Sequence, residues 1–247
     1  MNPSPYHAPF KSAHLRATIV KILLIVNAAA AGLSLMAEAL TLAFPLTDDQ
    51  ELGDNPLGAI VVLIVVMLAL IEFVVYLTTV VFFGMWLYRS YDNLRAFNAW
   101  ARPDYSPGWA VGSFFVPFVN LVVPYRAVKE VWQKSRTPDE AHLSEPAPPA
   151  SFPVWWMFWL LASFAANISF RVSMNENVPE STATMVSIVA GVLTVPAAFF
   201  AYLVVNSIDK RQEETSAKLR LGQLSGPPPP PADLMPAAFS PTNAQQG

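Results

Sequence analysis

Four apolar segments, each long enough to cross a lipid bilayer, dominate this sequence. They cover about residues 19–44, 57–87, 152–172 and 183–208. A helix rises 1.5 Å per residue, so roughly 20 residues span the hydrocarbon core of a membrane. Charged residues make up only 13% of the chain, against about 25% in a soluble domain. Too few charges remain to coat a surface in water, and we predict an all-α integral membrane protein.

A shorter apolar segment, residues 108–123, decides how often the chain crosses. It has 16 residues with Pro117 in its middle, and at 1.5 Å per residue it reaches about 24 Å, short of the roughly 30 Å core. Lys and Arg near span ends stay on the cytoplasmic side. If this segment does not cross, 14 of the 15 basic residues share one side, whereas a crossing divides them seven to eight. We predict four transmembrane helices plus one Pro-broken re-entrant or interfacial segment, with five transmembrane helices as the alternative.

This topology places both ends of the chain in the cytoplasm of a bacterial cell. The predicted cytoplasmic parts are an N-terminal segment at 1–18, an amphipathic surface helix at about 125–135, a Pro-rich linker at 137–153 and a disordered tail at 209–247. The first span ends near an Ala37-Glu38-Ala39 pattern of the kind that signal peptidase cleaves. Because apolar residues continue to Phe44, we expect this span to be retained as an anchor.

Composition and motifs argue against several classes of function. The net charge of −3 is unlike the basic surface that binds nucleic acid. The chain has no Cys, and its three His residues lie outside the spans in no metal-binding motif. No nucleotide-binding loop and no catalytic constellation are present. We therefore expect no cofactor and no enzymatic activity.

Polar and small residues recur on one face of each predicted span. Those faces carry Asn27, Ala31, Ser34, Glu38 and Thr41; Glu72, Tyr76 and Thr79; Ser163, Asn167 and Arg171; and Ser187, Gly191, Thr194 and Ala198. In lipid such faces pack against one another. A carboxylate at this depth needs a partner, so we predict that Asn27 bonds Glu72 and that Arg171 pairs with Glu38. With Asn167, these residues form the candidate intramembrane polar site.

A motif-rich stretch joins the second span to the short segment. Its characteristic residues are Trp86, Arg89, Asn93, Pro107, Trp109, Pro117, Asn120, Pro124 and Trp132. This pattern resembles the bacterial integral-membrane family known as domain of unknown function 4328 (DUF4328). The resemblance implies no established activity. Prolines break a helix here, and we expect Asn120 to hydrogen-bond the backbone groups that they leave unpaired.

Two functions are consistent with these features. The first is a non-enzymatic interaction, scaffold or regulatory module in the cytoplasmic membrane. Its contacts would be the lipid bilayer and other proteins, reached through the small-residue helix faces and the proline run Pro227–Pro231. The alternative is a transporter or channel component that uses Glu72 and the segment broken at Pro117.

Overall fold

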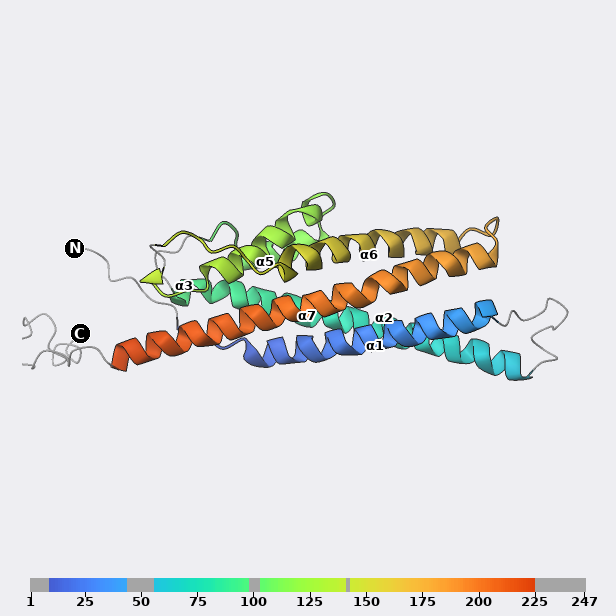
Figure 1. The fold of residues 1–247 in the computed structure, drawn as a ribbon, viewed down its shortest axis with the longest axis horizontal. Coiled ribbons are helices and arrows are strands. Elements are labelled where there is room, and N and C mark those ends of the chain that lie inside the picture. The colour runs from blue at the N-terminus through green and yellow to red at the C-terminus, as the bar shows by residue number, and fades with distance from the viewer. Residues whose placement is uncertain (1–8, 44–55, 98–102, 141–142, 225–247) are drawn as a thin grey trace, which may run out of the picture.

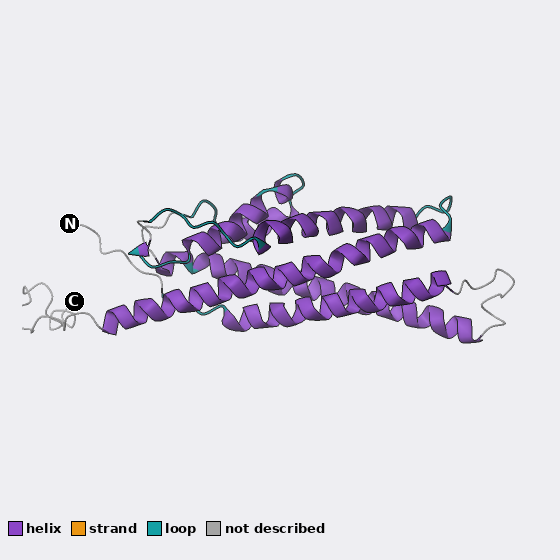
Figure 2. Ribbon diagram, in the orientation of Figure 1, coloured by secondary structure: helices purple, strands orange, loops and turns teal. Residues whose placement is uncertain are grey.

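Four long helices lie side by side in a bundle (Figure 1). The computed structural model describes residues 9–43, 56–97, 103–140 and 143–224. The long helices are α1 (His14–Ala43), α2 (Pro56–Asp92), α6 (Ser151–Ser173) and α7 (Glu180–Leu224). The described residues contain no strand (Figure 2). Each long helix holds a stretch long and apolar enough to cross a membrane, so the predicted all-α fold with four such helices is confirmed.

The helices continue past the apolar segments at the end of the bundle where α1 begins and α7 ends. We call this the terminal end, and the opposite end the loop end. The prediction of a disordered tail from residue 209 was wrong for residues 209–224, which extend α7. They stay helical because Asp209, Gln212 and Thr215 are buried against the rest of the chain. The proline run Pro227–Pro231 lies outside the described residues.

The long helices are arranged in the order α2, α1, α7, α6, each in contact with the next. A returning hairpin, residues 104–134, contacts α2 on one side and α6 and α7 on the other. It consists of α4 (Pro107–Gly112), two short 3-10 turns at Ser113–Phe115 and Val119–Leu121, and α5 (Val123–Lys134). A short helix, α3 (Leu94–Phe97), follows α2 on the way to the hairpin.

The returning hairpin starts and finishes at the terminal end. The backbone N–H of Asp104 donates to the Glu130 carboxylate at 2.7 Å, and the Lys134 ammonium lies 3.3 Å from the Asp104 carboxylate. The chain turns around Pro117, where the Asn120 amide donates to the Phe114 carbonyl at 3.3 Å, as expected for Asn120. The segment therefore returns to the end of the bundle where it began.

Aromatic rings fix the hairpin between α2 and α6. The Phe114 ring lies 5.8 Å from that of Phe83 on α2, and 6.4 Å and 5.9 Å from those of Trp156 and Trp159 on α6. Edge-to-face pairs at such distances are favourable beyond their buried area. The surface position predicted for residues 125–135 was wrong, because the apolar face of α5, with Val128 and Val131, is fully buried in the bundle.

Gly191 brings α7 close to α1. A Cβ atom added there would lie 2.8 Å from Cδ2 and 3.1 Å from Cγ of Leu35, whereas a Cβ on Gly32 would have no atom within 4 Å. Gly191→Val is expected to lower the free energy of unfolding by about 1–3 kcal/mol through overpacking. Gly32→Ala should instead be neutral or stabilising, since Ala favours a helix over Gly. Thermal unfolding in detergent checks both variants, and equal effects would contradict this packing.

Candidate functional site

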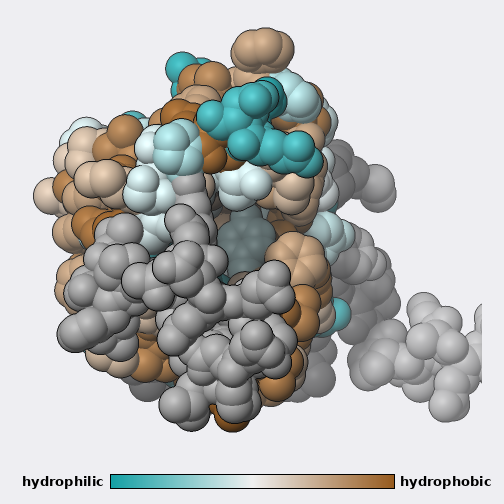
Figure 3. Space-filling view, turned by 90° about the vertical axis from the view of Figure 1, so that its right-hand side faces the viewer, coloured by the Kyte–Doolittle hydropathy of each residue, from teal (hydrophilic) through white to brown (hydrophobic). Residues whose placement is uncertain are grey.

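A cavity of about 340 Å³ lies between α1, α2, α6 and α7 in the half of the bundle nearer the loop end. Two carboxylates line it, from Glu38 on α1 and Glu72 on α2. The polar remainder of its lining is hydroxyls, from Ser34, Ser169, Ser173, Ser187 and Thr194. Figure 3, which looks at the loop end, shows a recess with hydrophilic atoms at its centre and apolar side chains along its right-hand border. We call this space the carboxylate cavity.

Helical spacing brings the polar groups of the carboxylate cavity together. Ser34 and Glu38 are one turn apart on α1 and so share a face. The Ser34 hydroxyl donates to Glu72 at 2.9 Å, and the Ser187 hydroxyl donates to Glu38 at 2.6 Å. Both carboxylates are half-buried. Each therefore accepts a hydroxyl hydrogen bond from a helix other than its own.

The predicted bond between Asn27 and Glu72 was wrong. Asn27 donates to the Thr79 hydroxyl at 2.6 Å and to the Leu23 carbonyl at 2.9 Å. Seven residues separate Asn27 from Ser34, and seven separate Thr79 from Glu72, so both pairs fit a single antiparallel register with two helical turns between them. The sequence-based estimate of depth had shifted α2 by these two turns.

The predicted ion pair of Glu38 with Arg171 was also wrong. Arg171 donates instead to Asn167 on its own helix at 3.1 Å, and both side chains are exposed. The predicted face of the fourth span, which included Asn167 and Arg171, therefore points outward. The face of α6 toward the carboxylate cavity carries Ala166, Ser169 and Ser173 instead, because small residues allow close packing against α7.

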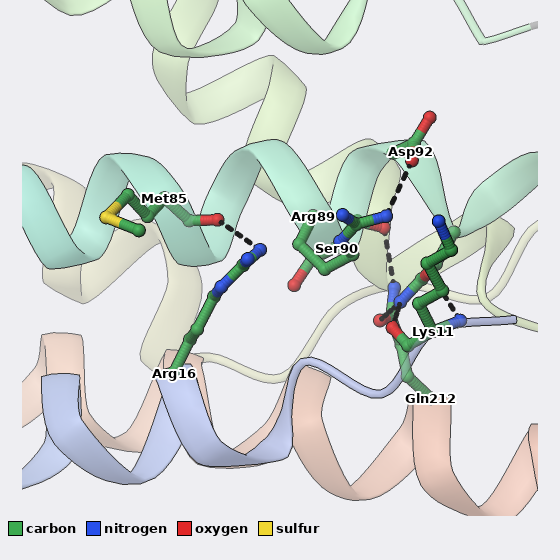
Figure 4. A network of polar contacts seen from close by, with 8 residues as sticks. Lys11, Arg16, Met85, Arg89, Ser90, Asp92 and Gln212 are labelled. Carbon is green, nitrogen blue, oxygen red and sulfur yellow. Dashed lines mark hydrogen bonds and ion pairs between the residues drawn. The ribbon is translucent and has the colours of Figure 1, made fainter.

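A second group of polar residues closes the terminal end of the bundle. Gln212 of α7 is buried; it donates to the Ser90 carbonyl at 2.8 Å and the Ser135 hydroxyl at 3.1 Å. The Asn93 amide donates to Gln212 at 3.3 Å and to the Lys11 carbonyl at 3.0 Å. Figure 4 shows Gln212 and Lys11 meeting at the end of α2. These bonds join α7 to the end of α2, to the segment before α1 and to the residue after α5.

Glu130 joins the two ends of the returning hairpin to α2. It is buried and accepts hydrogen bonds from the Tyr91 hydroxyl and, at 2.5 Å, from Lys134. The Tyr105 N–H in turn donates to the Tyr91 hydroxyl at 2.9 Å. Burial lowers the pKa of Lys134, but the carboxylates of Glu130 and Asp104 outweigh this effect and raise that pKa above its usual value. We call this set of contacts the Glu130 clasp.

The motif residues lie outside the carboxylate cavity, and most of them belong to the hairpin or pack against it. Trp86 and Pro124 are buried, and Arg89 pairs with Asp92 at 3.0 Å. Pro107 begins α4, where the N–H of Trp109 donates to Ser106 at 3.1 Å. The Trp132 indole donates to Ser207 at 3.0 Å, with the Arg211 guanidinium 4.2 Å from its ring centre. The turn is formed around Pro117 and Asn120, and Asn93 belongs to the terminal end, as described above.

Sequence reasoning missed Gln212 and Glu130. Gln212 fell in the predicted tail, although it continues the seven-residue spacing of Gly191, Ala198 and Val205 on one face of α7. Extending that spacing past the apolar segment would have found it. Glu130 fell within the surface helix predicted at about 125–135, and no sequence pattern showed that Tyr91 would cover it.

A family model matches residues 57–210, under the description Domain of unknown function (DUF4328). The match covers the motif residues, nearly all of α2, all of α6 and part of α7, and it confirms the resemblance predicted from the sequence. No curated protein and no solved structure matches the chain significantly.

Proposed function

The chain belongs to the DUF4328 family, whose description carries no activity, and we propose that it is a transporter or channel component that moves a small cation through the carboxylate cavity. The observation that carries this proposal is the joint lining of one cavity by Glu38 and Glu72. A carboxylate at membrane depth is costly and in most proteins marks an ion or proton path. One glutamate alone would be weak support for an ion path, and the presence of two in one cavity strengthens that support.

The chemistry of the lining favours a positively charged ligand. Among the described residues that line the cavity, none is Lys, Arg or His. The hydrogen bonds from Ser34 and Ser187 come from neutral hydroxyls, which orient the carboxylates without cancelling their charge. Oxygen ligands of this type suit hard cations. Two carboxylates surrounded by neutral hydroxyls suit a proton or a monovalent cation.

The interaction module, which was the first prediction from the sequence, has less support. The small residues of the α1 and α7 faces pack within the bundle, where Ala31, Ala190 and Ala198 are buried. They are therefore not available to a partner in this arrangement.

The proposed orientation puts the terminal end in the cytoplasm of a bacterial cell and the helix bundle in its cytoplasmic membrane. Lys11, Lys134 and Lys218 lie toward this end, whereas Arg171 lies near the loop end, in keeping with the positive-inside rule. The outer face of α2 carries exposed apolar side chains, among them Leu63 at 61%, which suits contact with lipid.

Carbodiimide labelling tests whether the cavity binds a cation. Dicyclohexylcarbodiimide reacts with carboxyl groups in apolar surroundings, and mass spectrometry locates the adduct. We expect modification at Glu38 or Glu72, and none at Glu176, which is exposed in the α6–α7 connection. Slowing by Na⁺ or K⁺ would identify a metal cation, and a response to pH alone would identify the proton. Labelling that responds to neither would contradict the proposal.

A further inference from the structure

A second cavity, of about 310 Å³, lies at the terminal end between α7 and the segment that follows α5. Its size is near the lower limit for ligand pockets, which measure about 300–1,000 Å³. Its charged lining consists of three basic and two acidic side chains, those of Arg136, Arg211, Lys218, Glu140 and Glu214. The described lining residues of this cavity and of the carboxylate cavity do not overlap. We call this space the arginine cavity.

Several contacts hold the guanidinium groups of Arg136 and Arg211 in place at this cavity. The Nε–H of Arg211 donates to the Ser135 carbonyl at 3.0 Å, and its guanidinium carbon lies 4.2 Å from the ring centre of Trp132. Arg136, the residue after Ser135, is only 9% exposed. Its Nη1 donates at 3.2 or 3.3 Å to three backbone carbonyls, those of Glu140, Leu143 and Ser144. Two groups of like charge are therefore held at one cavity.

Neither guanidinium has a counter-ion among the described residues, whose ion pairs include neither Arg136 nor Arg211. Of the two carboxylates in the lining, that of Glu140 pairs with Lys218 at 2.8 Å, and Glu214 is exposed. A buried charge is normally paired, because its removal from water is costly, and two charges of the same sign repel each other. An anion bound between the two guanidiniums would offset both costs.

We propose that the arginine cavity binds a phosphate group between Arg136 and Arg211. A guanidinium presents five N–H donors in a planar fork that matches the oxygens of a phosphate. The hydrogen bonds described above use Nη1 of Arg136 and Nε of Arg211, so both groups keep N–H donors for a ligand. The Ser144 hydroxyl, which also belongs to the lining, can supply a further donor.

The place of the arginine cavity in the bundle allows two sources of that phosphate. The apolar segment of α7 ends at about residue 208, so Arg211 lies within one turn of it, at the level of the lipid headgroups in a membrane. Basic pockets at this level bind anionic headgroups. Two lining residues, Glu214 and Lys218, are exposed, which leaves the cavity open to a soluble phosphate compound as well.

Native mass spectrometry of the full chain released from detergent micelles tests this site. The probes are inorganic phosphate and phosphatidic acid, a lipid whose headgroup is a phosphate monoester, and phosphatidylcholine is the comparison lipid. We expect one phosphate-bearing ligand per chain. Arg211→Gln should weaken its binding about tenfold, because the variant loses hydrogen bonds between charged groups. Glu214→Gln removes an exposed negative charge from the lining and should strengthen the binding severalfold.

Lys210→Gln is the matched control, because Lys210 is exposed on the same helix and does not belong to the described lining. Its binding should equal that of the wild type. Tighter binding of phosphatidic acid than of inorganic phosphate and phosphatidylcholine identifies a lipid headgroup as the source, and tighter binding of inorganic phosphate identifies a soluble compound. Binding of neither probe, or equal weakening by Arg211→Gln and Lys210→Gln, would overturn the site. If Arg211→Gln does not fold, unchanged binding in Glu214→Gln would overturn it.

Discussion

Glu72→Gln is expected to lower cation flux into proteoliposomes, and Glu38→Gln should do the same. Removing one charged partner of a buried contact typically costs 2–5 kcal/mol, which corresponds to a loss of about thirtyfold or more in cation affinity. Glutamine keeps the size of the side chain and the ability to accept a hydrogen bond from Ser34 or Ser187. The loss would therefore come from the charge rather than from a rearranged cavity.

The double variant distinguishes one shared cavity from two separate sites. Residues that act on one ligand give strongly non-additive effects, whereas distant sites add. Because Glu38 and Glu72 line the same cavity, the double variant should conduct no worse than either single variant. Glu176→Gln in the exposed α6–α7 connection is the matched control and should conduct like wild type. If the loss of cation flux in the double variant equals the product of the two single losses, Glu38 and Glu72 act at separate sites.

Glu130→Ala is expected to destabilise the protein by about 3–5 kcal/mol, the usual cost of removing one partner of a buried ion pair. The substitution leaves the Lys134 ammonium and the Tyr91 hydroxyl without their carboxylate and frees the N–H of Asp104. All three belong to the Glu130 clasp. Denaturant or thermal unfolding in detergent gives the loss, and hydrogen exchange should rise across residues 104–134 before it rises in α1.

Glu145→Ala provides the comparison for the clasp. Glu145 is exposed beyond the end of α5, and surface substitutions usually change stability by less than about 0.5 kcal/mol. A Glu130→Ala protein as stable as Glu145→Ala would show that the clasp does not hold the hairpin. Hydrogen exchange that rises equally along the whole chain would show that the Glu130 clasp does not stabilise the hairpin locally.

Hydrophobic length and charge placement predicted most of the fold. An apolar helix in a chain with few charges has one stable environment, so the approximate positions of α1, α2, α6 and α7 follow from the sequence. The shortness of residues 108–123 and the distribution of Lys and Arg predicted the returning hairpin. Asn120 was predicted to hydrogen-bond the backbone because Pro117 removes a backbone donor beside it, and its amide donates to the Phe114 carbonyl.

Side-chain pairing across helices was beyond the sequence because it depends on register. The faces that carry Asn27 and Glu72 were identified, but the two-turn offset that joins Asn27 to Thr79 appears only when α1 and α2 are packed together. Helical periodicity also cannot show which of two polar faces points inward, and for Arg171 the outward face was the correct one. The cavity that Glu38 and Glu72 share is formed by four helices, and the periodicity of one helix does not reveal it.

The stoichiometry of carbodiimide labelling tests the central claim most directly. If Glu38 and Glu72 share one cavity of about 340 Å³, a bulky adduct on one should block the other, and intact-mass spectrometry should find at most one adduct per chain within these two residues. Glu38→Gln should move all of the adduct to Glu72. A chain that carries adducts on both residues would show that the two carboxylates do not share a cation site.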